Sequence, residues 1–207
     1  MRSARKGYTL IEIMISVVIM TIGAAGIMAM QGASARSNQD AAQTSLAINF
    51  ATSWMERVKR DARMWTATGS GSLAATRYLS EFTKTGESKW FLPQTDTTNF
   101  PSESAAASVM GFETPLVVPA GSGLPIPYYC VNMRLTTAHQ TGGNLDALRV
   151  DVMVWWPRSD SVATTVKCSD GPLSAAQING TSADASKFRK HFLSTVVTWR
   201  DPTVTFP

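Results

Sequence analysis

A long apolar run lies near the start of the chain. From Tyr8 to Met30 there are 23 residues, and Glu12 is the only charged residue among them. At about 1.5 Å per residue, a helix over this stretch is about 34 Å long, enough to cross a hydrocarbon core about 30 Å thick. The pattern predicts a membrane-spanning helix with one carboxylate inside it.

A second, amphipathic pattern follows without a break. The chain turns polar from Gln31 onward, and no proline occurs before Pro93. Apolar residues then recur at intervals of four, four, four, four and three, which is the spacing of one helix face. These residues are Leu46, Phe50, Trp54, Val58, Ala62 and Trp65. The pattern predicts one helix from about residue 8 to 65, whose outer half packs on a core while its charged faces meet water.

The periodicity later changes to two, which predicts strands at residues 128–136, 148–156 and 193–199. Thr141-Gly142-Gly143-Asn144 forms a hairpin-like connection between the first two. Residues 73–127 are rich in Pro, Gly and Ser, which predicts an irregular connection with a short helix or strand inside it. Because helix and strands do not alternate, the fold class is α+β, with an antiparallel sheet packed on the outer half of the helix.

Composition and charge fit a folded chain with a basic N-terminus. The 207 residues are 44% hydrophobic and 16% charged, which is typical of a foldable protein. Arg2, Arg5 and Lys6 supply three of the four net positive charges, so 4 − 3 leaves +1 for the rest of the chain. Positive residues beside a membrane segment hold that end in the cytoplasm. Basicity therefore gives no support to nucleic acid as a partner.

Two ordinary interpretations of the apolar run are a cleaved signal peptide and a plain signal anchor with a stray acid. Ala33-Ser34-Ala35 resembles a small-residue cleavage site, so the first alternative is a secreted binding domain released after Ala35. Signal peptides carry about 7 to 15 apolar residues, fewer than this run, and Glu12 inside one would oppose insertion. N-terminal sequencing of the mature protein separates these alternatives.

The stretch from Lys6 to Glu12, Lys-Gly-Tyr-Thr-Leu-Ile-Glu, resembles the type III signal of type IV prepilins. A short basic leader ends in Gly7, an aromatic residue follows, and Glu12 stands fifth after the glycine. Tyr8 replaces the more common Phe. The resemblance implies that a prepilin peptidase cuts between Gly7 and Tyr8 and methylates the new N-terminus of Tyr8. Residues 23–31 are similar to the same stretch of minor pilins of the PilV type.

The resemblance also implies a domain organisation. Residues 1–7 are the leader, 8–36 the transmembrane and assembly half of the helix, 37–66 its amphipathic half, and 67–207 a globular β-rich domain. The implied fold is pilin-like, a long N-terminal helix packed on a C-terminal antiparallel sheet.

The implied function is that of a non-enzymatic minor pilin, which helps to prime or cap the assembly of a type IV pilus. Its implied partners are the prepilin peptidase, the inner-membrane assembly platform, other minor pilins and the major pilin. It would cross the bacterial inner membrane once, with a periplasmic C-terminal domain, and then enter the pilus, including its tip. The alternative within the superfamily is a minor pseudopilin of type II secretion. Those are usually shorter, so residues 73–127 favour the pilus.

The presence of Glu12 inside the apolar run requires a physical explanation. A carboxylate at membrane depth costs about 2.5 to 3.5 kcal/mol unless it finds a partner or stays protonated. Cleavage after Gly7 would create a cation, the α-amine of Tyr8. In an array of parallel helices staggered along one axis, a neighbour's amine can come alongside Glu12. Such a pair would favour one register, and we expect Glu12 to set how this subunit docks beside another pilin.

Cys130 and Cys168 are the two cysteines, and both fall in the part predicted to be outside the cytoplasm, where disulfides persist. A bridge between them closes a loop of about 39 residues and stabilises the domain by about 4 kcal/mol in the chain-entropy model. Pilins commonly link their C-terminal region in a similar way.

The sequence predicts no catalytic site, cofactor or metal site. His139 and His191 are the only histidines, and no nucleophile or metal-binding motif frames either of them. The carboxylates Glu103, Glu113 and Asp151 show no paired arrangement. We expect the protein to be a substrate of an enzyme, not an enzyme.

Overall fold

The computed structural model describes residues 7–66, 70–93, 104–118, 122–158, 168, 171–179 and 185–199. The chain divides into two compact units, Met1–Gln43 and Thr44–Pro207. In chain order the elements are α1 (Leu10–Asp61), η1 (Ala62–Met64), η2 (Ser70–Ala75), α2 (Glu81–Thr85), β1 (Trp90–Phe91), β2 (Ala106–Ala107), β3 (Tyr129–Thr141), β4 (Asn144–Pro157), α4 (Ala175–Asn179), η4 (Ala185–Lys187) and β5 (Phe188–Thr198).

The first unit contains the apolar run and the first polar turns of α1, and its described side chains are all exposed from residue 7 to residue 42. The helix is unbroken from Leu10 to Asp61, so residues 23–32 are helical despite their three glycines. Two hydroxyls in the apolar stretch donate to backbone carbonyls, Ser16 to Glu12 at 2.7 Å and Thr21 to Val18 at 2.8 Å. The length and apolarity of this helix, together with the pairing of these two hydroxyls, fit membrane anchoring.

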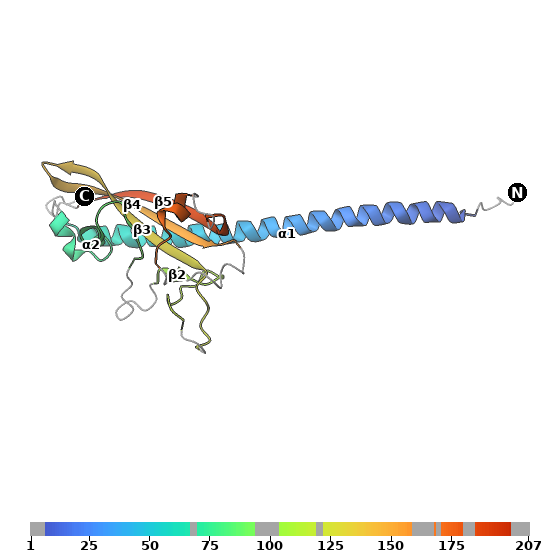
Figure 1. The fold of residues 1–207 in the computed structure, drawn as a ribbon, viewed down its shortest axis with the longest axis horizontal. Helices are drawn as coiled ribbons and strands as arrows, with labels where there is room; N and C mark the ends of the chain where they lie inside the picture. The colour runs from blue at the N-terminus through green and yellow to red at the C-terminus, as the bar shows by residue number, and fades with distance from the viewer. Residues whose placement is uncertain are drawn as a thin grey trace, which may run out of the picture. The chain divides into compact units, whose positions relative to one another are not determined.

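The second unit contains an antiparallel sheet with the strand order β1-β3-β4-β5, and β2 also pairs with β3 (Figure 1). The three predicted strands are present, each longer than the alternating pattern indicated. The β3–β4 hairpin closes at Gly142 and Gly143, whose φ angles of 58° and 85° lie in the left-handed region. Tight hairpin turns need this conformation at both central positions, so the predicted turn is confirmed.

The main core lies between the last turns of α1 and one face of the sheet. Five of the six predicted helix positions are buried, and Leu46 is half-buried. In β4 the residues at even positions from 148 to 156 face this core, as predicted. Large, fully buried side chains in this core include Trp54, Trp65, Tyr129, Leu135, Leu148 and Trp156. The architecture is therefore α+β and pilin-like, with the amphipathic part of α1 packed on an antiparallel sheet.

Two contacts join the irregular segment to α1. Arg57, expected on a water-facing side of the helix, instead forms an ion pair with Glu113, and its side chain is only 11% exposed. The Arg57 guanidinium also lies 4.9 Å from the centre of the Trp54 ring. The Asp61 carboxylate accepts the backbone N–H groups of residues 77, 78 and 79 at 2.6, 2.7 and 3.2 Å. The segment expected to be irregular is thus fixed by buried or half-buried charges.

Candidate functional site

The segment around the predicted cleavage site is the non-helical start of the described chain. Gly7, Tyr8 and Thr9 precede α1, and the Thr9 carbonyl accepts the first helical N–H groups, from Glu12 at 3.1 Å and Ile13 at 3.3 Å. Tyr8 is 80% exposed. The peptide bond between Gly7 and Tyr8 is therefore accessible and outside regular structure, as proteolysis requires.

The chain's own packing does not require a glycine at position 7. A Cβ atom built on Gly7 would meet no atom within 4 Å, and its φ is not in the left-handed region. A glycine serves a fold where a side chain would clash or where φ is positive, and neither condition holds here. A requirement for Gly7 would therefore come from a partner outside this chain.

Glu12 lies in the first turn of α1, where a negative charge interacts favourably with the helix dipole. Its side chain is exposed, and within the described part of the chain no cation contacts its carboxylate. Tyr8 stands only four residues earlier in the chain. The geometry leaves the Glu12 carboxylate open to a group from another molecule.

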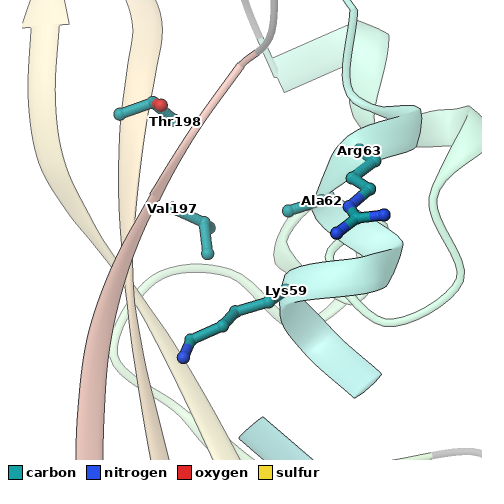
Figure 2. A pocket seen from close by; sticks show the side chains of 5 residues that line it. All are labelled: Lys59, Ala62, Arg63, Val197 and Thr198. Atoms are coloured by element: carbon teal, nitrogen blue, oxygen red, sulfur yellow. The ribbon is translucent and has the colours of Figure 1, made fainter. Parts of the chain in front are cut away.

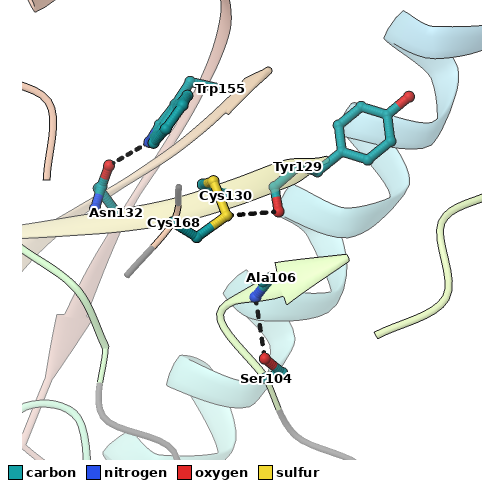
Figure 3. Close-up of a disulfide and its surroundings, with 7 residues drawn as sticks. All are labelled: Ser104, Ala106, Tyr129, Cys130, Asn132, Trp155 and Cys168. Atoms are coloured by element: carbon teal, nitrogen blue, oxygen red, sulfur yellow. Dashed lines mark hydrogen bonds between the residues drawn. A yellow bond between two sulfur atoms is a disulfide. The ribbon is translucent and has the colours of Figure 1, made fainter. Parts of the chain in front are cut away.

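The second predicted site is present as a disulfide between Cys130 and Cys168, with Cα atoms 5.4 Å apart (Figure 3). Both half-cystines are buried, and the Cys168 Sγ lies 3.6 Å from the carbonyl oxygen of Tyr129. Figure 3 shows Tyr129 directed toward α1, on the opposite side of β3 from the disulfide. The bridge therefore ties residue 168 to the sheet face that does not carry the main core.

That outer face holds a second apolar cluster, which the alternating pattern did not reveal. Met153 and Trp155 alternate with the core residues of β4, and the structure buries both against the disulfide, Phe188 and Leu173. The indole N–H of Trp155 donates to the Asn132 side-chain oxygen at 2.6 Å. One end of β4 is therefore covered on both faces.

Farther along the same face, Asp151 is the centre of a polar cluster. Its carboxylate accepts hydrogen bonds from Arg134 at 2.7 Å, Arg149 at 2.9 Å and Ser194 at 2.6 Å. Burial raises the pKa of this carboxyl, but the hydrogen bonds and the charge of Arg134 outweigh burial and hold the pKa below its usual range. The cluster is a cross-strand lock through β3, β4 and β5, since residues 134, 151 and 194 are register partners.

We expect Asp151→Asn to lower the free energy of unfolding by about 1–2 kcal/mol at pH 7, because charge-assisted hydrogen bonds become neutral ones. A pKa lowered by folding contributes stability above the unfolded value, near 3.9, and this is lost as pH falls through the folded value. The gap between wild type and variant in urea unfolding should therefore shrink below about pH 4. Asp146→Asn is the control, because no cation contacts Asp146 in the described residues. A gap that is constant with pH would contradict the assignment.

The histidines and carboxylates considered as catalytic candidates in the sequence lie apart from one another in the described part of the chain. His139 lies at the exposed end of β3, with its Nε2 3.3 Å from the Thr141 hydroxyl, whereas His191 lies on β5 opposite Val154. Glu113 pairs with Arg57, and Glu103 lies outside the described residues. None of the described candidates forms an acid–base pair or a nucleophile–base pair with another.

Two open cavities flank the contact between α1 and β5. The first, of about 300 Å³, lies where α1 ends, and Figure 2 shows Lys59 extending from the helix toward β5 near Val197. The second, of about 420 Å³, lies at the other end of β5 and includes His191 and Thr44 in its wall. Sequence reasoning identified neither cavity, because each joins residues that are more than a hundred positions apart.

Comparison with known proteins gives one match. The family model described as the prokaryotic N-terminal methylation motif matches residues 2–28 of the chain. No curated protein and no solved structure matches it. The match covers Gly7, Tyr8 and Glu12 together with most of the apolar run, so the chain carries the N-terminal motif of prokaryotic pilins and pseudopilins.

Proposed function

We propose that this chain is a minor pilin of a type IV pilus, of the PilV type, that helps to prime or cap filament assembly. The observation that carries the proposal is the matched methylation motif at the head of an unbroken helix, followed by a sheet domain. Its parts are a leader at residues 1–7, a membrane and assembly segment at 8–36, an amphipathic segment at 37–66 and a globular domain at 67–207. The role is structural, and the protein is the substrate of a processing enzyme.

In this proposal the chain first crosses the inner membrane once, with its basic leader in the cytoplasm and its sheet domain in the periplasm. A prepilin peptidase then cuts after Gly7 and methylates the amine of Tyr8. The assembly platform extracts the subunit, and other minor pilins and the major pilin become its neighbours in the filament. The disulfide supports a periplasmic location for the domain, because such bonds persist in an oxidising compartment.

Two alternatives to a minor pilin can be weighed against the sequence and the structure. A minor pseudopilin of a type II secretion system would carry the same motif, and residues 73–127 favour the pilus only by their length. A secreted domain released after Ala35 would need a cut inside α1, where residues 33–35 are helical. Helical backbone has its amide and carbonyl groups paired and fits a peptidase cleft poorly, which favours cleavage at Gly7.

Cleavage is tested first. We expect Gly7→Val to abolish leader removal, because a branched side chain crowds the scissile bond while the chain's own packing tolerates it. Intact-mass measurement of the membrane-extracted protein should show the full leader on Gly7→Val and a methylated Tyr8 at the start of wild type. Gly7→Ala, with its small side chain, is the matched control and should be partly processed.

The mature N-terminus separates the alternatives in the same experiment. A start at Arg36 would establish the secreted domain and overturn the pilin proposal. A leader retained on assembled wild-type protein would also contradict it. To separate pilus from secretion system, a gene deletion should be scored for piliation, surface motility and protein secretion together. Loss of pili or motility with normal secretion supports the pilus, and the reverse supports the pseudopilin.

A further inference from the structure

The apolar turn, residues 108–112, presents three large apolar side chains to solvent directly after β2. Val109, Met110 and Phe112 are 52%, 72% and 68% exposed. They lie within four consecutive positions, so they are close together on the surface. Large apolar side chains that are grouped and exposed in this way mark a surface that contacts another molecule.

Hydrogen bonds and a close contact with α1 fix the backbone of the apolar turn. The Ser108 N–H donates to the Phe112 carbonyl at 2.7 Å, and the Gly111 N–H donates to the Ser108 carbonyl at 2.8 Å. The φ angle of Gly111 is 82°, and a Cβ atom on this residue would lie 3.0 Å from the Leu46 Cδ2. The turn is therefore pre-formed beside the helix, so a partner does not have to order it on binding.

A charge pair anchors the end of the apolar turn to the same helix. Glu113 pairs with Arg57 and also accepts the backbone N–H of Ser104 at 2.7 Å. Ala107 and Glu113 form a β-bridge across the base of the turn, and β2 pairs with β3. All of these contacts lie within the unit Thr44–Pro207, so the sheet domain holds the turn in place by itself.

The chain around the apolar turn contains no cationic residue. No Lys, Arg or His occurs between Lys89 and Arg134, and the acidic residues of that stretch are Asp96, Glu103 and Glu113. Segments that bind an anionic membrane surface or nucleic acid use Lys and Arg for much of their affinity. The composition therefore favours an uncharged, apolar protein surface as the partner of the turn.

The apolar run of α1 is a surface of this chemistry. Residues 13–30 carry no charge, and every Ile, Val and Met among them is at least 55% exposed. These side chains lie on all sides of the helix, and a helix that is apolar all round must be covered by lipid or by protein. A subunit that leaves the membrane for a filament therefore needs protein contacts along this segment.

We propose that the apolar turn docks on the uncharged apolar helix of a neighbouring subunit, over the segment equivalent to residues 13–30. The contact removes Val109, Met110 and Phe112 from water, which is favourable, and it covers part of a helix that has lost its lipid. This inference rests on one part of the proposed function, assembly into a filament, but it does not depend on which filament the subunit enters.

The test uses the mature full-length chain in mild detergent, with the photoreactive residue p-benzoylphenylalanine in place of Met110. The probe is a second copy of the chain, because it carries the helix that the proposal requires. Isotopically labelled and unlabelled copies are mixed, so a crosslinked pair of peptides with both isotopes comes from two chains. We expect mass spectrometry to find such mixed pairs between position 110 and residues 13–30.

A matched pair of variants separates the apolar turn from other exposed apolar side chains. Phe112→Asp in the photoreactive chain should lower the yield of mixed pairs about tenfold, because a carboxylate is costly against an apolar helix. Phe192→Asp makes the same change on β5, where Phe192 is 48% exposed, and should leave the yield as it is. Both side chains are exposed, so both variants should keep the disulfide and the far-UV circular dichroism of wild type. Equal loss in the two variants would overturn the proposal.

The remaining outcomes identify other partners of the apolar turn. Crosslinks only to detergent or to added phospholipid would reject the helix in favour of a membrane surface. Crosslinks confined to one chain or to the sheet domain of the second copy, or no crosslinks at all, would also reject it. Since this readout involves no pili, the deletion experiment remains separate. Loss of pili on deletion without the crosslink would sink this inference alone, whereas the crosslink in a chain whose deletion spares pili and motility would sink only the assignment to a pilus.

Discussion

Cys130→Ser is expected to lower the free energy of unfolding of the sheet domain by about 4 kcal/mol, because the unfolded chain regains the entropy of a loop of about 39 residues. The bond is buried within the second cluster, between β3 and residue 168, so a serine there also meets an apolar environment. Urea unfolding of the mature protein under oxidising conditions, followed by tryptophan fluorescence, measures the change. An effect of this size is a large fraction of the stability of a typical domain.

The double variant gives the sharper result. Cys130→Ser with Cys168→Ser should be no less stable than the single variant, because both lose one and the same link. Cys130→Ala controls for the buried hydroxyl, and a reducing agent should bring wild type to the level of the double variant. If thiol labelling finds two freely reactive cysteines in the native protein, the link is absent and the prediction fails.

Glu12→Ala should reduce co-purification with other minor pilins about tenfold, equivalent to about 1.4 kcal/mol in binding. At about 4 Å and an effective dielectric near 20, attraction between Glu12 and a neighbour's Tyr8 amine is about 4 kcal/mol, and desolvation offsets part of it. Insertion and cleavage should be unaffected, since removing a charge eases membrane entry and Gly7 lies five residues away. Comparison at equal membrane levels isolates docking from expression.

Glu12→Gln decides whether charge is the cause. Glutamine keeps the shape and hydrogen-bonding capacity of glutamate, so under the ion-pair hypothesis it should behave like alanine. Glu12→Asp retains the charge on a shorter side chain and should recover part of the interaction. If Gln behaves like wild type, hydrogen bonding or a protonated Glu12 suffices, and the ion-pair explanation is wrong.

Local features of the chain were predictable from the sequence because they depend on neighbours along it. The 23-residue apolar run and the later helical spacing predicted α1 and most of its buried stripe, and strict alternation predicted three strands and the Gly142–Gly143 turn. Gly7, Tyr8 and Glu12 were also identified this way, since the motif is contiguous. The match to the methylation motif confirms the family resemblance of this stretch, while cleavage after Gly7 and the pairing of Glu12 stay predictions.

Long-range contacts decided what the pattern could not. The alternating pattern placed Met153 and Trp155 on the sheet face opposite the main core. They are buried because residues 168 and 173 fold over that face. Arg57 has the sequence context of a water-facing cation, and its ion pair with Glu113 exists because a loop 56 residues away returns to α1. The segment expected to be irregular contains the short helix α2 and the strands β1 and β2. Each of these strands has only two residues, which is too short to leave a periodic signal in the sequence.

The sequence by itself determined the long apolar helix, the α+β class and the N-terminal methylation motif, because each depends on residue types at short, regular spacing. The tertiary structure decided which charges are buried, which side of β4 is covered and where cavities form. The cavity at the start of β5 is the clearest case, since Thr44, Trp156 and Arg158 come together with the first residues of β5 only when helix and sheet pack together. The covering of the second face of β4 and the pairing of buried charges depend on segments that are distant in the sequence, so local spacing in the chain does not encode them.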